Sequence, residues 1–203
     1  MKWVLTRYNH DIGWLKEYTE DWVMYDRSPV KLDDPRVIPV PNIGSDIYDK
    51  LKWIIDNYEN LPDVVLLAKA NLFKYISKKE FDLVKDNKTF TPLLTKNHKT
   101  VDGTTFYSED GMYNELNNAW YLNHYPVKSN QIMNELGELL GFTGQKFLKF
   151  APGANYILLK ENILQHPKAL YEVLFSYLGW SGDTTQDEGE SQMIERAFYS
   201  IFK

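Results

Sequence analysis

The hydrophobic pattern of the first 70 residues alternates between short apolar runs and helical stripes. Runs at residues 2–6, 22–25 and 37–40 have the length and composition of strands, and apolar residues recur at helical spacing over residues 12–22. The run VVLLA at residues 64–68 is apolar at every position, which is typical of a strand covered on both faces of a sheet. This order of strands and helices predicts an α/β fold rather than a sandwich.

Residues 41–62 predict a turn, a helix and a second turn. Asn42 and Gly44 supply a turn that tolerates positive φ, and Ser45 or Asp46 can cap the first free amides of the helix. One face of the helix is apolar through Ile47, Leu51, Ile54, Ile55 and Tyr58. The helix leads straight into residues 64–68, so the two form a helix–strand unit around which a site can be built.

The pattern is less regular beyond residue 71. Ser77 and Ser129 are expected to cap helices, Pro167 to open another, and residues 193–201 to form the last one. Residues 90–94 and 146–159 have β character, residues 114–125 predict a helix, and residues 181–190 predict a flexible acidic loop. The whole chain is expected to fold as one α/β domain, with a mixed, mostly parallel, Rossmann-like sheet flanked by helices.

Composition and charge exclude several classes of function. A net charge of −5 over 203 residues argues against non-specific nucleic-acid binding, which needs a basic face. The absence of Cys removes disulfides and thiolate metal sites. No apolar run reaches membrane-spanning length, and the start MKWVLTRYNHD becomes polar too early for a signal peptide. The expectation is a soluble, cytoplasmic protein.

Familiar catalytic motifs are missing. The chain contains no GxxxxGK[ST], GxGxxG, GxSxG or HExxH. The four histidines are far apart and lack ligand spacing, so the sequence predicts no histidine metal site. An Asp-x-Asp that could bridge Mn²⁺ or Mg²⁺ to phosphates would be expected at residues 69–71, where the chain reads Lys-Ala-Asn. No cofactor is evident, and use of Mn²⁺ or Mg²⁺ stays open.

Polar residues gather where predicted strands end, and ligands of open α/β sheets bind at that edge. The candidate binding residues there are Thr6, Arg7, Tyr8, Asn9, Asp11, Asn42, Gly44, Asp46, Lys69 and Asn71. Arg7 could pair with a phosphate, Tyr8 could stack on a base and Asp11 could hold a ribose or uracil donor. Lys69 could supply the charge that a metal gives elsewhere. The alternatives are that Asp11 caps a helix and that Lys69 only ends a strand in solvent.

Carboxylates in two segments of the chain are candidates for a general base. Glu195 lies at the apolar boundary of the last predicted helix, where burial would raise its pKa, and Arg196 beside it is a further candidate for diphosphate binding. Asp110 and its neighbour Glu109 are the competing candidates, on a loop that could close over a substrate. The alternative for Glu195 is an exposed ion pair.

Four blocks of the sequence carry a resemblance. They read TRYNHDIGWL from Thr6, PNIGSDIYDKLKWIIDNYENLPD from Pro41, PGANYILLKENILQHPKALY from Pro152 and IERAFYSIF from Ile194. The chain resembles a glycosyltransferase-like family encoded by viruses, fungi and bacteria, whose second block reads P-N-x-G-R-E-x-x-T-Y-L-x-x-I-x-x-N-Y-D-N-L-P-D. The family's Gly-Arg-Glu is Gly44-Ser45-Asp46 here, and its Glu after Tyr-Asn is His10.

The resemblance implies a GT-A-like fold and a reaction. Residues 1–94 would form a nucleotide-binding half and residues 95–203 an acceptor-side half. The activity would be transfer of a sugar from a nucleoside-diphosphate donor to a glycan or other hydroxyl acceptor, without a metal if Lys69 or Arg7 holds the leaving group. Two other classes stay open: a non-catalytic nucleotide- or sugar-binding module, and a structural or interaction protein on the same scaffold.

Overall fold

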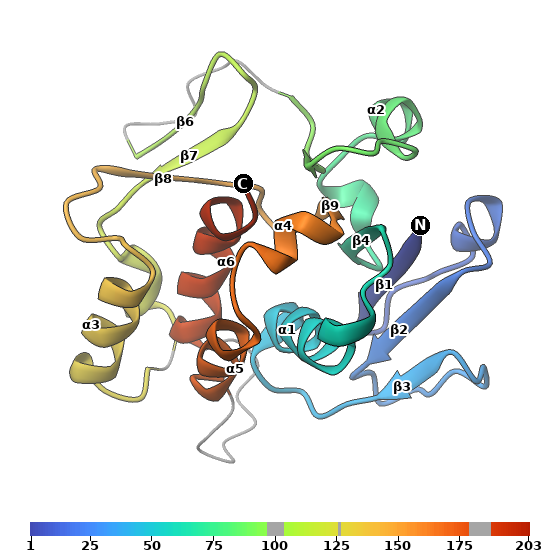
Figure 1. The fold of residues 1–203 in the computed structure, drawn as a ribbon, viewed down its shortest axis with the longest axis horizontal. Helices are drawn as coiled ribbons and strands as arrows, with labels where there is room; N and C mark the ends of the chain where they lie inside the picture. The colour runs from blue at the N-terminus through green and yellow to red at the C-terminus, as the bar shows by residue number, and fades with distance from the viewer. Residues whose placement is uncertain (97–103, 126, 179–187) are drawn as a thin grey trace.

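The computed structural model describes residues 1–96, 104–125, 127–178 and 188–203, and its centre is a six-stranded sheet (Figure 1). The strand order is β3-β2-β1-β4-β9-β5. Four strands are parallel to one another: β1 (Lys2–Arg7), β2 (Trp22–Asp26), β3 (Val37–Pro39) and β4 (Val64–Lys69). Antiparallel pairing brings in β9 (Tyr156–Leu159) and β5 (Thr91–Pro92). The predicted mixed, mostly parallel α/β sheet is therefore confirmed.

Side chains of the central strands alternate between two hydrophobic cores. Val4, Val65 and Leu67 face a core built with α1 (Ser45–Asn57), α5 (Lys168–Ser176) and α6 (Gly189–Phe202). Leu66 and Ala68 face the other core, which is closed by α2 (Lys78–Val84) and the 3₁₀ turns η1 (Leu15–Glu17) and η3 (Leu72–Lys74). Because successive strand residues point to opposite faces, the fully apolar run at residues 64–68 serves both cores.

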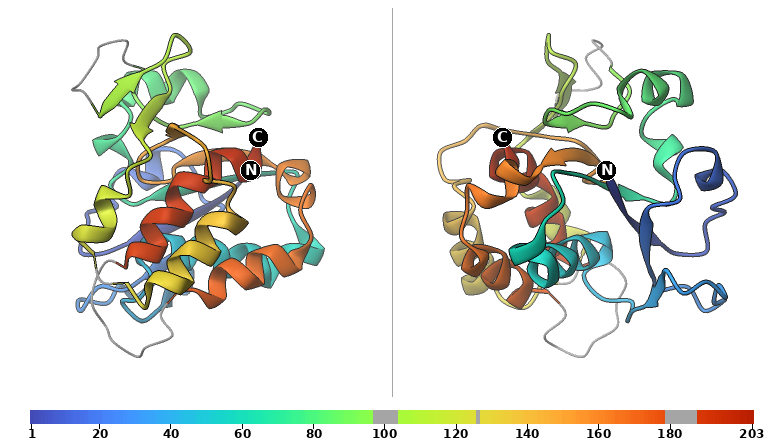
Figure 2. Two further views of the ribbon diagram at one scale, coloured as in Figure 1. Left: turned by 90° about the vertical axis from the view of Figure 1, so that its left-hand side faces the viewer. Right: turned by 45° about the vertical axis from the view of Figure 1, so that its right-hand side comes forward.

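The second half of the chain adds a small sheet and more helices. The strands β6 (Thr105–Tyr107), β7 (Tyr113–Leu116) and β8 (Phe147–Phe150) form an antiparallel sheet against α6. Figure 2 shows α3 (Asn130–Leu139) running beside α6. The remaining elements are α4 (Lys160–Leu164), η2 (Tyr58–Asn60) and η4 (Trp120–Asn123). Among the described helices, none is long and apolar enough to cross a membrane.

Several predicted element boundaries are confirmed. The hydroxyls of Ser77 and Ser129 accept hydrogen bonds from the third amide of α2 and α3, as N-caps do. Pro167 precedes α5, and the apolar face of α1 is buried at Ile47, Leu51 and Ile54. The predicted acidic loop at residues 181–190 lies largely outside the described residues.

Two predicted helices are wrong. Residues 12–22 form only the single turn η1, because Trp22 pairs with Trp3 as part of β2. Residues 114–125 contain β7 and η4 instead of one helix. Between them, the Asn117 side chain donates to the backbone carbonyls of Phe142 and Gln145, and Ala119 has φ of 52°. A side chain that bonds distant backbone and a left-handed residue both interrupt a helix.

Candidate functional site

The candidate site lies at the carboxyl ends of β1 and β4, where the chain connections on the two sides of β1 run in opposite directions across the sheet. From β1 the chain moves to β2 on one side, whereas β4 enters on the other side after α1. Thr6 and Lys69 are register partners at the carboxyl ends of the two strands, and Ala70 N donates to Thr6 O at 2.8 Å. Adjacent parallel strands with diverging crossovers form a topological switch point, the usual place for a ligand crevice in open α/β sheets.

A cavity of about 200 Å³ opens at this point. Its lining residues come from the ends of β1, β2 and β4 and from the start of α1: Thr6, Arg7, Tyr8, His10, Arg27, Asn42, Ser45, Asp46, Lys69 and Asn71. The geometric prediction that the segments around Arg7, Gly44 and Lys69 meet at one edge of the sheet and leave a hollow is confirmed. What each lining residue does there stays a prediction.

Arg7 lines the cavity, and its guanidinium is fixed by bonds to buried neighbours. Arg7 Nη1 lies 2.8 Å from a carboxylate oxygen of Asp26, which is completely buried, and also donates to Ser28 Oγ at 2.9 Å. Arg7 Nε donates to the carbonyl of His10. No hydrogen bond of Nη2 is found within the described part of the chain, so this nitrogen is available to a ligand.

Arg27 is a second cation on the wall, and the sequence did not single it out. Its side chain is only 6% exposed, and Arg27 Nη2 lies 2.6 Å from Asp49 Oδ2. Although the two charges are close, their angle is not that of a hydrogen bond. Neither Nη2 nor either oxygen of Asp49 has a hydrogen-bond partner among the described residues. Burial raises the pKa of Asp49 to about 7, against the opposing effect of Arg27.

A buried charge network connects the cavity to the interior. Asp46 lies between two ammonium groups: Lys69 Nζ is 2.8 Å away, and Lys50, one helical turn further along α1, also donates to it. Burial disfavours the charged carboxylate, but Lys50 and Lys69 outweigh burial and lower the pKa of Asp46. Lys69 is in turn held charged: burial opposes its positive charge, and the carboxylates of Asp46 and Glu195 raise its pKa.

Glu195 reaches this network from α6. One of its carboxylate oxygens accepts a hydrogen bond from Gly153 N at 2.5 Å, and the carbonyl of Gly153 accepts one from Lys50 Nζ at 2.8 Å. Burial raises the pKa of Glu195, with Lys69 acting in the opposite direction. The four sequence blocks that carry the family resemblance therefore meet here, through Arg7, Asp46, Gly153 and Glu195. They are far apart in the chain and adjacent in the fold.

Two residues that line the cavity, His10 and Asn71, each have a polar atom without a partner among the described residues. His10 Nδ1 and Asn71 Oδ1 are buried and have no hydrogen bond among the described residues. Burial, followed by the positive charges of Lys69 and Arg7, lowers the pKa of His10, which favours a neutral imidazole. A buried polar atom without a partner is costly, and at a cavity wall such an atom is typical of a ligand contact.

The start of α1 differs from the prediction in one respect. Gly44 has φ of 59°, as the turn requires, but neither Ser45 nor Asp46 caps the helix. Asp46 is instead held by the two lysines, a stronger interaction for a buried carboxylate than one amide bond. The first amides of α1 therefore have no side-chain cap where the helix begins beside the cavity, and a helix N-terminus favours anions.

Three predicted binding residues lie beside the cavity and do not line it. Asn9 is exposed, and its amide donates to Ser28 Oγ. Asp11 is exposed and accepts from Gly13 N, so it closes a local turn and does not cap a helix. Gly44 is buried against Leu178 and Tyr48. All three shape the backbone of the loops that carry the lining residues.

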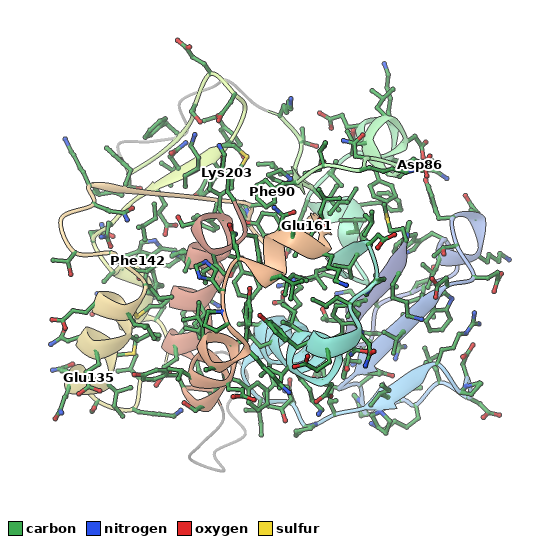
Figure 3. All side chains as sticks on the ribbon, in the orientation of Figure 1. Asp86, Phe90, Glu135, Phe142, Glu161 and Lys203 are labelled. Atoms are coloured by element: carbon green, nitrogen blue, oxygen red, sulfur yellow. The ribbon has the colours of Figure 1, made fainter. Side chains whose placement is uncertain are left out.

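Asp110 and Arg196 are not brought to this cavity. Asp110 closes the β6–β7 turn, where hydrogen bonds from Ser108 and from Lys149 lower its pKa. It lines a different cavity of about 570 Å³, between α2 and the end of α6, where Figure 3 labels Phe90 and Lys203. Arg196 forms a buried pair with Glu115 of β7 at 2.5 Å. The charge of Arg196 is therefore paired within the contact between α6 and the small sheet.

The missed residues carry weak sequence signals. Arg27 directly follows β2, so the rule that selected Arg7 and Lys69, polar residues after a strand, also applies to it. Lys50 is four residues after Asp46, a spacing that places both on one helix face. His10 falls inside the first block of the resemblance, but nothing in its neighbours indicates that its ring nitrogen is buried.

Comparisons with known proteins give one family. Searches of curated proteins and of solved structures find no match to the chain. A family model described as "Protein of unknown function (DUF3431)" matches residues 4–203. This match includes all the cavity-lining residues and both carboxylates of the buried network. The protein is thus a member of the DUF3431 family.

Proposed function

We propose that this protein is a glycosyltransferase that binds a nucleoside-diphosphate sugar in the cavity at the ends of β1 and β4. The observation that carries the proposal is the composition of the wall: Arg7, Arg27 and Lys69 line it, while the carboxylates of Asp26 and Asp49 are buried behind the arginines. Cations that face a cavity with their counter-ions behind them suit a diphosphate.

The rest of the wall suits the other parts of such a donor. Asn71 Oδ1 and His10 Nδ1 are unpartnered atoms that can bind sugar or ribose hydroxyls. Tyr8, 43% exposed at the mouth, can stack on a base. The cavity is smaller than the roughly 300 Å³ of pockets that enclose drug-sized ligands, so it would hold part of the donor and leave the rest over the mouth.

The buried network supplies roles for the transfer itself. An acceptor hydroxyl would attack the anomeric carbon, and the bond between that carbon and the diphosphate oxygen would break. Glu195, with a pKa raised by burial, would take the hydroxyl proton. Lys69, kept charged by Asp46 and Glu195, would stabilise the negative charge on the departing diphosphate. Lys69 would thus act where a metal-bound Asp-x-Asp is expected.

A second candidate is a non-catalytic nucleotide- or sugar-binding module. Its support is that each wall cation already has a carboxylate partner and that Ser45-Asp46 replaces the Arg-Glu of the resembling family. Such a module would bind the donor and leave it intact. A third class, a structural protein on this scaffold, gains no support from an open cavity with unpartnered polar atoms.

Calorimetric titration with a panel of nucleoside diphosphates and their sugar conjugates, with and without Mn²⁺, tests the proposal. We expect at least one conjugate to bind and the Lys69→Met variant to weaken it by about tenfold or more, the loss of one charge-assisted contact. Asp46 keeps Lys50 in this variant, so the fold should survive.

Lys52→Met is the matched control, because Lys52 forms an exposed pair with Asp56 on the same helix and should not affect binding. Donor hydrolysis or transfer, followed by chromatography of the released diphosphate, separates the transferase from the binding module. Absence of binding by every member of the panel would count against both.

A further inference from the structure

The Arg27–Asp49 pair is built differently from the other ion pairs of the site. Asp49 is completely buried, and neither of its oxygens has a hydrogen-bond partner among the described residues, although Arg27 Nη2 is 2.6 Å away. Within the described part of the chain, Arg27 Nη1 makes only one long hydrogen bond, 3.3 Å, to the carbonyl of Ile43. Asp26, by contrast, accepts three hydrogen bonds from Arg7 and Ser28.

The charged and titratable groups around Asp49 come from two elements. On α1, Asp46 and Lys50 oppose each other in their effect on Asp49, and they are bonded to each other. On β2 and the residues that follow it, Tyr25 stays a neutral phenol because burial raises its pKa, and Arg27 is the cation in contact. The ionised form of Asp49 therefore depends mainly on Arg27, which is also one of the residues that line the cavity.

We propose that Arg27 is an anion-binding residue of the cavity and that Asp49 takes up a proton when the anion binds. The inference rests on the proposed function only for the identity of the anion, a phosphate group of the donor. The step makes and breaks no other covalent bond. A proton from solvent joins an Asp49 oxygen, and the anion replaces Asp49 as the ionic partner of the Arg27 guanidinium.

The physical reason is competition between two anions for one cation. A carboxylate with no hydrogen bonds loses its main stabilisation when a phosphate or sulfate occupies Arg27, and protonation removes the buried charge. Because burial already raises the pKa of Asp49 to about 7, the proton is available near neutral pH. Anion binding is therefore tightest below about pH 7, where Asp49 is already protonated, and it weakens as the pH rises above this value.

Sulfate is the probe, because its charge is constant over the range of interest. Its binding is followed by the NMR shifts of the Ser45 and Asp46 amides at constant ionic strength, between about pH 5.5 and pH 8.5. We expect the wild-type dissociation constant to rise by about tenfold over this range, the effect of a shift of about one pKa unit on binding. Asp49→Asn should remove most of that rise and bind sulfate at high pH as the wild type does at low pH. Arg27→Gln should lose binding.

The controls separate Asp49 from other titrating groups. His10 and Glu195 remain in the Asp49→Asn variant, so any pH dependence left in it belongs to them. Asp56→Asn, an exposed carboxylate on the same helix, should keep the wild-type profile. If Asp49→Asn does not fold, the ¹³C shift of the Asp49 carboxyl in the wild type replaces it, and should move toward the protonated value when sulfate is added at about pH 7.5.

The results that would overturn this inference differ from the results that would refute the proposed function. The same pH dependence in wild type and Asp49→Asn, an unmoved carboxyl shift, or unchanged sulfate binding in Arg27→Gln would each overturn the inference. Sulfate binding with the expected pH dependence, but no binding of any nucleotide, would leave the inference standing and refute the proposed donor.

Discussion

Two carboxylates on one helix illustrate how environment sets the chemistry of a residue. Asp46 and Asp49 are one turn apart on α1, and both are almost completely buried. Asp46 contacts two ammonium groups, and its pKa is lowered; Asp49 has one poorly aligned arginine, and burial raises its pKa to about 7. The balance of desolvation against neighbouring charge decides each sign.

Asp46→Asn should destabilise the protein at neutral pH, because it leaves Lys50 buried with its charge uncompensated, which typically costs about 3–5 kcal/mol. Asp46 has a lowered folded-state pKa, so its contribution is present above about pH 4 and is lost as the pH falls further. Urea unfolding measures the free energy of unfolding of wild type and variant from about pH 7 down to about pH 3. The difference between the two free energies should shrink as the pH falls. Asp56→Asn, on the exposed side of the same helix, should shift the free energy of unfolding by less than about 0.5 kcal/mol.

The stability of Asp49→Asn should depend on pH in the opposite way to that of Asp46→Asn. With a folded-state pKa raised to about 7, Asp49 contributes stability below about pH 4 that is lost progressively up to about pH 7. Relative to wild type, the variant should gain stability as the pH rises through this window and keep a constant difference above it. A difference that stays constant from about pH 4 to pH 8 would contradict the buried, unbonded carboxylate.

At the scale of elements, the loop between β8 and β9 organises the network. Gly153 has φ of 82°, its amide bonds Glu195 and its carbonyl bonds Lys50. A Cβ on Gly153 would lie 2.8 Å from both Asn155 and Tyr75. Asn155 is fully buried, and its side-chain oxygen accepts from the amide of Lys69. One short loop thus fixes the end of β4, the middle of α1 and the middle of α6.

Gly153→Ala should weaken both stability and donor binding, because the added methyl meets two packed side chains. Gly141→Ala is the matched control: Gly141 also has positive φ, 69°, but a Cβ there has nothing within 4 Å. The control should cost only the left-handed strain of about 1–2 kcal/mol and leave binding unchanged. Thermal unfolding and calorimetry of both variants measure the difference, and equal effects would mean that the packing around Gly153 is not important.

At the scale of the molecule, the two sheets are joined through α6. The helix packs on β8, and Arg196 reaches Glu115 on β7 while its guanidinium lies 4.1 Å from the ring centroid of Tyr121. Glu195, the preceding residue on the same helix, accepts a hydrogen bond from Gly153 in the loop between β8 and β9. One helix therefore carries a carboxylate that bonds the amide of Gly153 and an arginine that pairs with the second sheet.

Arg196→Met should lower the free energy of unfolding by about 3–5 kcal/mol, because it leaves the Glu115 carboxylate buried and unpaired. Donor affinity measured on the folded variant should stay the same. The double variant Arg196→Met with Glu115→Leu should recover part of the stability, since it removes both buried charges. Weaker donor binding with unchanged stability would instead support the diphosphate-binding role that the sequence suggested for Arg196.

The sequence by itself determined the main sheet and the edge where the cavity lies. Strands and the central helix follow from local periodicity, and polar residues after β1 and β4 follow from position alone. Only the tertiary structure decided which cations face the cavity and which carboxylates lie behind them. Glu195 and Asp110 were both candidates in the sequence; the fold places Glu195 close to Lys69 and Asp110 in the β6–β7 turn. Burial and long-range charge contacts depend on residues far apart in the chain, which no local pattern records.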